Sequence, residues 1–439
     1  MLRPRIGNLL PDNLLIKVKV IILMDTTVYD MKSNLEGERA RLEKADISQS
    51  AKDAITEFLD SVRIDDVTSH RIFFYAVRLR LTAEMMQDSF LHPDLRSVQK
   101  FVANLKTTTS RRGSEYSQNT INDFRIALKR FYKWKGLLTP EMAEILKKRE
   151  SKANRRSEDI ITQSEVRSLI SNAVSPRDKL LIALAYDSGC RISEILTMRI
   201  RDVKTDEYGL ILHVTGKTGE RKVRCVGDSV ALFNDWIARH PLRDSPSAWL
   251  FIKIDSGKYK FNGEAMDYDT AVKVLQNASI RAGINRRIHW HLFRHTRATL
   301  LARDVKEAPL EAQMGWVHGS KQTQTYVHLS DQDVDTSILR AYGIEVKDNK
   351  KMHIDELPRV CERCGTVNTS DAVYCKKCAL PLNRAKLQEI TEKEEKTLNI
   401  LENLDLNESE KALLDAIKDD KELMDKLLLR ILRSLKERE

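Results

Sequence analysis

The sequence GCRISEIL occupies residues 189–196, and the sequence HLFRHTRATLL occupies residues 291–301. In the first stretch a Gly-Cys pair precedes Arg191, and the residues that follow predict a helix that starts at this arginine. In the second stretch His291 and Arg294 are three residues apart, so they share one face of a predicted helix. Both stretches therefore place charged or hydrogen-bonding side chains at fixed points of apolar helical segments.

A β-hairpin is predicted between these two helices. The segments GLILHVT (209–215) and KVRCV (222–226) are rich in β-branched residues, and they flank the sequence Gly-Lys-Thr-Gly at 216–219. Paired strands joined by a tight turn are expected from this pattern. Lys217 is the second residue of that turn. On its own, a lysine in such a turn indicates no more than a solvated side chain.

Helical segments precede these elements. Between residues 48 and 136 apolar positions recur at helical spacing, as in TINDFRIALKRFYKWKG (120–136). One face of this last helix is expected to be apolar, with Ile121, Phe124, Leu128 and Phe131, and the opposite face mostly basic, with Arg125, Lys129, Arg130 and Lys133. Two interpretations stay open: a solvated basic helix on a small bundle, or a helix laid along phosphates with Tyr132 and Trp134 near its end.

A second domain is predicted to begin near residue 162. The stretch LKKRESKANRRSED (146–159) is highly charged, which is typical of an exposed linker. Thr162 and Glu165 then form the pattern of a helix-capping box before an apolar run. Because helices are expected on both sides of the hairpin, the predicted fold is mainly α-helical with a small β-hairpin or sheet.

The composition describes a basic globular protein. Apolar residues make up 41% of the 439 residues, charged residues make up 31%, and the net charge is +10. A basic balance favours a polyanionic partner, of which nucleic acid is the commonest. No segment reaches the roughly 18 apolar residues that span a bilayer, since the longest candidate, 14–24, is short and contains two lysines. Without a secretory cleavage site, the expected compartment is the cytoplasm, with no membrane association.

A further stretch, QMGWVHGSKQTQTYVHLS (313–330), completes a set of segments in fixed order. Together they resemble the conserved boxes of tyrosine recombinases, the integrases. GCRISEIL is similar to "TGLRxSELL", HLFRHTRATLL to "HxLRHTxAT", and the third stretch to "LGHxxxxTTxxYxH". The resemblance covers about residues 50–345. It implies a helical core-binding domain followed by an α+β catalytic domain.

The resemblance also implies a chemistry, in which a DNA phosphodiester is exchanged for a covalent phosphotyrosine. Tyr326 would be the nucleophile and would split one exchange into two transesterifications. Arg191 and Arg294 would hold the non-bridging oxygens, because guanidinium forks stay protonated and suit that geometry. Lys217 would protonate the departing 5′ oxygen, and His291 would act as the base or orient one.

One departure from the family pattern concerns the phosphate ligand. The family has histidine, or sometimes tryptophan, nine residues before the tyrosine, whereas Trp316 lies ten and His318 eight residues before Tyr326. Trp316 is the expected hydrogen-bond donor to the phosphate, and His318 is the alternative. Glu194 is expected to brace the arginine that opens its helix or the active-site histidine. The scheme needs no metal or nucleotide cofactor for catalysis and no small-molecule substrate.

Four of the six cysteines are expected to bind structural zinc. They form two Cys-x-x-Cys pairs separated by ten residues, at Cys361, Cys364, Cys375 and Cys378. In a chain without an export signal this spacing is typical of a zinc ribbon and not of disulfides. Four thiolates leave no open coordination position, so the metal would have no catalytic role. Cys190 and Cys225 are isolated in the sequence.

The chain is expected to comprise six parts. These are an N-terminal extension (1–44), a helical core-binding domain (45–145), a basic linker (146–161), the catalytic domain (162–345), the zinc ribbon (346–382) and a charged helical tail (383–439). The tail carries an apolar stripe that predicts a helix packed on the protein itself or on a second copy. Its residues are Met424, Leu427, Leu428, Ile431, Leu432 and Leu435.

The expected function is that of a site-specific recombinase on double-stranded DNA, and the ribbon and tail are most similar to archaeal members of the family. Self-association into tetramers on paired sites and a place on the nucleoid are implied by the resemblance. A DNA-binding regulator or inactive integrase remnant is one alternative, although the expected catalytic residue types are all present. A topoisomerase-like DNA-relaxing enzyme is another, which the compact size and the integrase-like boxes disfavour.

Overall fold

The computed structural model describes residues 28–65, 67–109, 113–150, 160–216, 219–254, 263–319, 323 and 357–382. Lys217, Tyr326 and the apolar stripe expected in the tail lie outside these residues. Within them the fold is mainly α-helical with a small antiparallel sheet, as the sequence predicts. None of the helices in this part of the chain has the length and apolar character that crossing a membrane requires.

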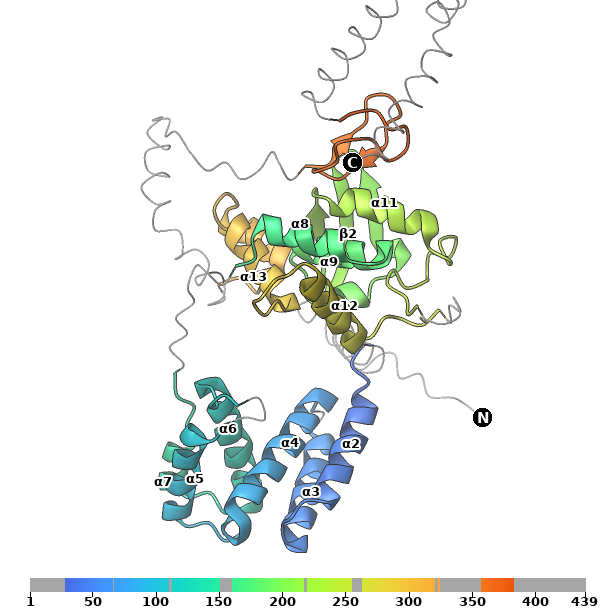
Figure 1. Cartoon of the computed structure of the whole chain (residues 1–439). Helices are drawn as coiled ribbons and strands as arrows, with labels where there is room; N and C mark the ends of the chain where they lie inside the picture. The colour runs from blue at the N-terminus through green and yellow to red at the C-terminus, as the bar shows by residue number, and fades with distance from the viewer. Residues whose placement is uncertain are drawn as a thin grey trace, which may run out of the picture.

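The first part of the structure is a helical bundle with an apolar core of its own (Figure 1). Its α-helices are α2 (Met31–Glu43), α3 (Gln49–Ile64), α4 (Ser69–Met86), α5 (Leu95–Thr107), α6 (Gln118–Lys135) and α7 (Pro140–Ile145). Ser48, Asp94 and Ser117 fix the starts of α3, α5 and α6, because each side chain accepts a hydrogen bond from a backbone amide three residues later.

Helix α2 lies within the residues assigned to the N-terminal extension, yet it packs against α4 as part of the bundle. Leu42 is buried in the bundle core. Glu38 is also buried, because Arg80 of α4 donates from Nε to its Oε1 at 2.7 Å. The spacing of apolar residues cannot reveal a buried ion pair. The sequence alone therefore did not indicate that the bundle begins at Met31.

Helix α6 confirms the predicted apolar face and corrects the basic one. The four predicted apolar residues are buried, whereas Lys133 is exposed. Arg125, expected opposite the core, is only 5% exposed, and Tyr132 is fully buried with its hydroxyl 3.8 Å from the Sδ of Met86. Neither side chain can therefore lie along a phosphate, because each belongs to the packed interior of the bundle.

The second part contains the predicted hairpin in a three-stranded antiparallel sheet. Its strands are β1 (Val203–Asp206), β2 (Gly209–Gly216) and β3 (Gly219–Cys225), in the order β1-β2-β3. Gly216 pairs with Gly219, so the turn lies where the sequence places it. The short, mostly exposed strand β1 was not predicted, because its sequence VKTD has no β-strand pattern.

Helices form most of the rest of this part of the structure (Figure 1). They are α8 (Gln163–Asn172), α9 (Pro176–Ser188), α10 (Ile192–Leu196), α11 (Ser229–Arg239), α12 (Tyr268–Arg281), α13 (Trp290–Leu301) and α14 (Glu307–Met314). The predicted capping box is confirmed at the start of α8, since Thr162 and Glu165 exchange both hydrogen bonds. Arg286 also binds Glu165 through two nitrogens at 2.8 and 2.7 Å, which ties the start of the domain to the residues before α13.

The cysteine-rich segment forms a small unit at one side of this domain (Figure 1). Two short strands, β4 (Arg359–Val360) and β5 (Val367–Asn368), pair in antiparallel fashion. The unit contacts α11, and Val367 packs against the apolar core of the second part.

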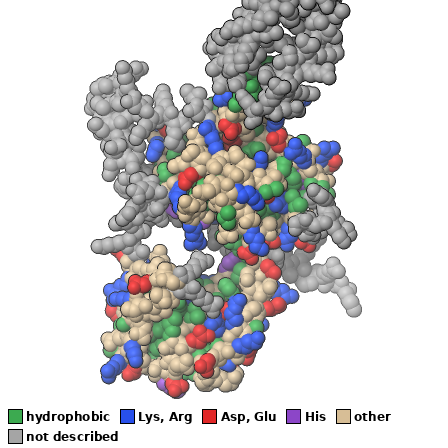
Figure 2. Space-filling view, in the orientation of Figure 1, with side chains coloured by type: hydrophobic (Ala, Val, Ile, Leu, Met, Phe, Trp, Pro, Cys, Tyr) green, Lys and Arg blue, Asp and Glu red, His purple; other side chains and the backbone are tan. Residues whose placement is uncertain are grey.

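Basic and acidic side chains are interspersed over the face of the protein drawn in Figure 2. Lys and Arg residues occur on both the bundle and the second part, with Asp and Glu between them. The overall basic balance is therefore not enough to locate a polyanion on this face. A functional site has to be argued from local geometry.

Candidate active site

The turn between α9 and α10 places Arg191 at the start of α10, directly after the buried helix α9. Gly189 follows α9 with φ 62°, a left-handed conformation that glycine adopts without strain. A Cβ atom there would lie 3.0 Å from the Cβ of Arg297 and 3.1 Å from the Cε of Met314. Both the backbone conformation and the close packing therefore require glycine, and Arg191 follows as the N-cap of α10, as predicted.

Glu194 lies at the centre of a cluster of guanidinium groups. It is 2% exposed and accepts a hydrogen bond at 2.8 Å from Nη1 of Arg191 and another at 2.9 Å from the backbone nitrogen of that residue. Arg221 donates to both carboxylate oxygens, from Nη1 at 3.2 Å and from Nη2 at 2.9 Å. Burial tends to raise the pKa of Glu194, but the hydrogen bonds and charges of Arg221 and Arg191 hold this pKa below its usual value. Glu194 is therefore ionised and binds two arginines.

Arg221 on β3 is a site residue that the sequence analysis missed. Besides Glu194 it contacts the backbone oxygen of Gln313 at 3.3 Å and the Sγ of Cys190 at 3.7 Å. Gly315 has φ 65°, a left-handed conformation that favours glycine, and a Cβ atom there would lie 2.8 Å from the Cζ of Arg221 and would displace this guanidinium. The strand alternation offered a signal, because Arg221 falls on the same face of β3 as the buried residues at 223 and 225.

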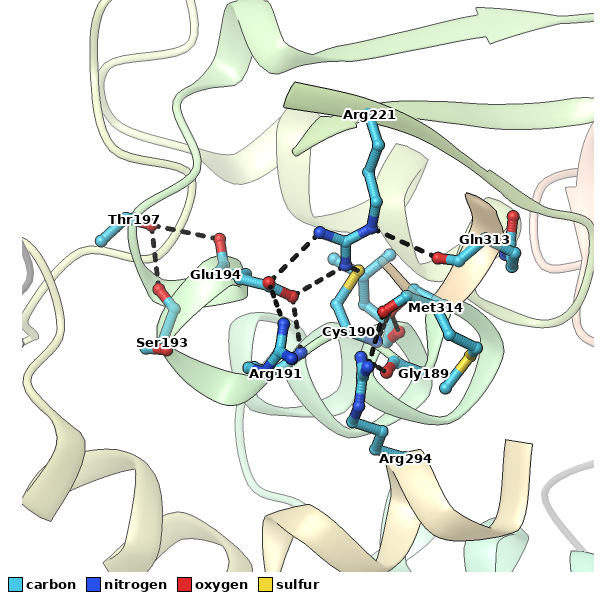
Figure 3. A network of polar contacts seen from close by, with 12 residues as sticks. Gly189, Cys190, Arg191, Ser193, Glu194, Thr197, Arg221, Arg294, Gln313 and Met314 are labelled. Carbon is cyan, nitrogen blue, oxygen red and sulfur yellow. Dashed lines mark hydrogen bonds and ion pairs between the residues drawn. The ribbon is translucent and has the colours of Figure 1, made fainter. Parts of the chain in front are cut away.

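Arg294 points from α13 toward the same cluster (Figure 3). It is 3% exposed, and its guanidinium donates to the backbone oxygens of Gly189 at 3.0 Å and Met314 at 2.5 Å. Within the described part of the chain no carboxylate lies at ion-pair distance from it. Burial, followed by the charge of Arg191, lowers the pKa of Arg294 to about 10. Arg294 is therefore a buried guanidinium whose hydrogen-bond partners in the described residues are uncharged carbonyl groups.

The resulting cluster has an excess of positive charge. Three guanidinium groups, those of Arg191, Arg221 and Arg294, surround the single carboxylate of Glu194 (Figure 3). Arg191 is the most accessible of the three, with 33% of its side chain exposed, compared with 9% for Arg221. Such an arrangement favours an anion that accepts hydrogen bonds from guanidinium groups, such as a phosphate diester.

Trp316 and His318, the two candidates for the phosphate ligand, lie in different surroundings. Trp316 is 9% exposed and packs with Leu310 and Met314, and the Cζ of Arg294 lies 5.8 Å from its ring centroid. His318 has 87% of its side chain exposed. The structure thus places Trp316 beside Arg294.

Glu311 forms hydrogen bonds with His318, Gly319 and Thr323. Its side chain binds Nδ1 of His318 at 2.8 Å and accepts hydrogen bonds from the backbone nitrogen of Gly319 at 3.3 Å and Oγ1 of Thr323 at 2.9 Å. The hydrogen bond to Glu311 raises the pKa of His318. Thr323 precedes Tyr326 by three residues in the sequence, and the sequence did not indicate the buried glutamate that binds it.

His291 occupies an exposed position in the first turn of α13, one turn before Arg294. Its ring meets that of His295 edge-on, with centroids 4.6 Å apart. Among the described residues, groups of three or more His, Cys, Asp or Glu side chains close enough to share a metal ion were found only at the four paired cysteines. His291 and His295 therefore do not belong to such a group.

The ligand atoms of the four paired cysteines lie within 4.8 Å of one another. Cys361 and Cys378 have their Sγ atoms 3.5 Å apart, and those of Cys364 and Cys375 are 3.6 Å apart. A tetrahedral zinc ion with Zn–S bonds of about 2.3 Å separates its sulfur ligands by about 3.8 Å. The arrangement of the thiols therefore fits a tetrahedral metal ion.

This part of the chain is similar to several known proteins. Residues 159–333 match the phage integrase family. Transposase A from transposon Tn554 of Staphylococcus aureus is 27% identical over 219 residues, which are 47% of this chain and 57% of the transposase. Tyrosine recombinase XerA of Pyrococcus horikoshii is 27% identical over 295 residues, which are 67% of this chain and 95% of XerA.

A solved structure shares the fold. The crystal structure of XerH site-specific recombinase bound to palindromic difH substrate, a post-cleavage complex, has a TM-score of 0.50 and 17% identity. The match covers 75% of this chain and 96% of the XerH chain. By contrast, this chain spans little more than half the length of the Tn554 transposase.

Proposed function

We infer that this chain is a tyrosine recombinase, and we propose that it cuts and rejoins duplex DNA at specific sites through a 3′-phosphotyrosyl intermediate. The phage integrase match over residues 159–333 and the fold shared with XerH support this assignment. The observation that carries the activity is the excess of guanidinium charge around Glu194. A DNA phosphodiester is an anion that such a site would accept.

Arg191 and Arg294 are proposed to bind the non-bridging oxygens of the scissile phosphate. Arg294 is held by two carbonyl groups and has its pKa lowered by burial, so a bound anion would relieve an unfavourable charge. In the transition state more charge develops on these oxygens, which strengthens both interactions. We propose that Glu194 and Arg221 position Arg191 and do not contact the reacting atoms.

Tyr326 is the proposed nucleophile. Its oxygen would form a bond to phosphorus while the bond from phosphorus to the 5′ oxygen breaks. His291 would accept the tyrosine proton or orient the group that does, and Lys217 would donate a proton to the departing oxygen. The position of Gly216 supports the second role, since a Cβ there would lie 2.6 Å from Oε1 of Glu194, so the residue directly before Lys217 lies next to the arginine cluster.

The activity is tested with nicked duplexes, on which a covalent intermediate is trapped because the cleaved fragment diffuses away. We expect a protein–DNA adduct that survives denaturation. DNA binding without an adduct on any candidate site would favour the DNA-binding regulator. Relaxation of arbitrary supercoiled plasmid without site preference would favour the topoisomerase-like enzyme.

Double-stranded DNA is the proposed partner, in the cytoplasm on the nucleoid, with tetramers on paired sites. The XerH structure, whose description names a DNA substrate, supports the first of these. We propose that residues 45–145 bind DNA as the core-binding domain and that residues 162–345 carry out catalysis. The XerA relative from Pyrococcus, matched over 95% of its length, supports an archaeal type of recombinase.

Replacing Trp316 with phenylalanine should lower the rate of adduct formation by about 10²-fold, the usual cost of removing one hydrogen-bond donor to a transition-state oxygen. The ring would still fill the space beside Arg294, so folding should be preserved. His318→Ala is the matched control, with an expected loss below about tenfold, because Glu311 keeps its other two partners. Rates would be measured from single-turnover cleavage. A larger loss in His318→Ala would make His318 the phosphate ligand.

We propose that the four paired cysteines hold a structural zinc ion, which would keep this small unit folded. The convergence of their sulfur atoms supports the proposal. With all four positions occupied by thiolates, the ion would stay out of the phosphoryl-transfer step.

The double variant Cys361→Ser/Cys364→Ser should lose the metal, whereas the purified wild-type chain should contain about one zinc ion per molecule. Far-ultraviolet circular dichroism should stay nearly unchanged, because the core of the catalytic domain is built from other residues. Cys225→Ala is the control, since this cysteine is buried in that core away from the pairs. Metal content would be measured by elemental analysis. Zinc retained at wild-type stoichiometry in the double variant would contradict the proposal.

A further inference from the structure

The cysteine-rich unit makes specific polar contacts with the catalytic domain. Ser370, between the two cysteine pairs, binds the carboxylate of Asp228 twice, from its backbone nitrogen at 2.6 Å and from its Oγ at 3.1 Å. Ser370 is 5% exposed, and Asp228 lies at the start of α11. Burial raises the pKa of Asp228, so the two donors from Ser370 compensate for lost hydration. One half-buried carboxylate thus recognises the loop between the cysteine pairs.

Two further contacts extend this interface along α11. Lys376, directly after a cysteine, places its Nζ 2.6 Å from Oδ1 of Asp235 and 3.4 Å from the backbone oxygen of Ala231. Val367 adds an apolar contact with the core of the catalytic domain. Charge, hydrogen bonding and apolar burial therefore all match between the two surfaces.

We propose that the cysteine-rich unit is an intramolecular clamp, in which metal binding shapes residues 367–376 so that they dock on α11 of the same chain. The partner recognised by this surface is the catalytic domain, and the docked residues are not available to read DNA. The metal then stabilises the catalytic domain as well as the unit that holds it. This proposal rests on the proposed zinc site.

The geometry explains why docking would depend on the metal. Ser370 lies between the two pairs, and Lys376 adjoins Cys375, so the positions of both contacts follow from the arrangement of the thiolates. The unit is held mainly by hydrogen bonds among its own residues, and the apolar side chains buried among its described residues include those of Cys361 and Cys375, two of the proposed zinc ligands. An element of this size has too little core to hold that shape without its metal.

The contact between Ser370 and Asp228 is linked to the arginine cluster through helix α9. Asp187 of α9 accepts a hydrogen bond from the backbone nitrogen of Ser229, next to Asp228, at 3.0 Å. Two residues after Asp187, Gly189 supplies a carbonyl group to Arg294. The clamp therefore acts on the helix pair α9 and α11, one end of which supports the arginine pocket.

The test is hydrogen–deuterium exchange on the full-length protein in three forms: metal-loaded, treated with a chelator, and carrying Asp228→Ala. In both altered forms, we expect amides at the start of α11 to exchange about tenfold faster or more, since the two hydrogen bonds from Ser370 to the half-buried carboxylate of Asp228 are lost. Asp228→Ala should keep its zinc. Asp244→Ala is the control, because this carboxylate is 95% exposed, and its exchange should match the wild type.

The outcomes separate the clamp from the zinc site. If chelation speeds exchange only within residues 357–382, and α11 is unchanged in Asp228→Ala, the clamp is refuted and the metal site stands. If purified protein holds no metal but Asp228→Ala still deprotects both surfaces, docking stands and its dependence on metal is refuted. A charge reversal adds a second check: Asp235→Lys should weaken docking, and Asp235→Lys/Lys376→Asp should restore it.

Discussion

Replacing Tyr326 with phenylalanine should abolish the covalent protein–DNA adduct and leave DNA binding unchanged. The substitution removes one hydroxyl group and keeps the ring, so it deletes the nucleophile without altering the charge of the arginine cluster. Loss of a nucleophile typically lowers an enzymatic rate by about 10⁴-fold or more. The measurement is adduct yield on nicked substrates after denaturing electrophoresis, together with affinity for the same duplex from a gel-shift assay.

Tyr208→Phe provides the matched control for this experiment. Tyr208 lies in the turn between β1 and β2 and is 69% exposed, so its hydroxyl group is accessible. It is distant in the sequence from the segment that contains Tyr326. Its variant should form adducts at the wild-type rate. An adduct that persists in Tyr326→Phe would mean that another residue is the nucleophile. Loss of both adduct and binding would instead indicate that Tyr326 has a structural role.

The sequence predicted those parts of the site that depend on local order along the chain. The turn before Arg191, the helix containing Arg294 and the pairing of Gly216 with Gly219 follow from glycine positions and helical or strand periodicity, and the structure confirms them. Each of these features is local: the longest, the helix α13, extends over 12 residues, a range over which periodicity and turn chemistry are informative.

The features that the sequence did not predict arise from contacts between distant segments. Arg221 binds Glu194, 27 positions earlier, and Arg80 binds Glu38 across 42 positions. In both cases a charged residue is buried because its partner is buried with it, whereas a pattern based on polarity assigns both to the surface. The same reasoning accounts for Asp228, whose partner in the cysteine-rich unit lies 142 positions away.

Glu194→Gln should lower both the rate of adduct formation and the free energy of unfolding, because Glu194 is the carboxylate that binds Arg191 and Arg221. The change is nearly isosteric, but it removes the one negative charge among Arg191, Arg221 and Arg294 and turns part of the acceptor into a donor facing other donors. Breaking a buried ion pair by removing one partner costs about 3–5 kcal/mol. We expect a fall of about that size in the free energy of unfolding from urea denaturation, and about 10²-fold slower adduct formation, as for a lost transition-state contact.

The loss of stability in Glu194→Gln should depend on pH, whereas a loss caused by a general packing defect should not. The folded protein holds the pKa of Glu194 below its usual value, mainly through Arg221 once the opposing effect of burial is overcome. Its contribution to stability is therefore complete above the ordinary pKa of a glutamate, about 4.3, and is lost as the pH falls through the lowered value. The stability difference between wild type and Glu194→Gln should accordingly shrink under acid.

Binding and cleavage should also separate in Glu194→Gln. Losing a negative charge beside three guanidinium groups raises the local positive potential, so affinity for duplex DNA at low salt should be equal to or higher than that of the wild type. Adduct formation should fall because Arg191 and Arg221 no longer have a common carboxylate to fix their positions. Glu207→Gln, at an exposed position in the β1–β2 turn, should leave both quantities unchanged. If Glu194→Gln lost affinity and adduct formation in the same proportion, Glu194 would serve DNA binding as a whole and would not be a positioning residue for Arg191.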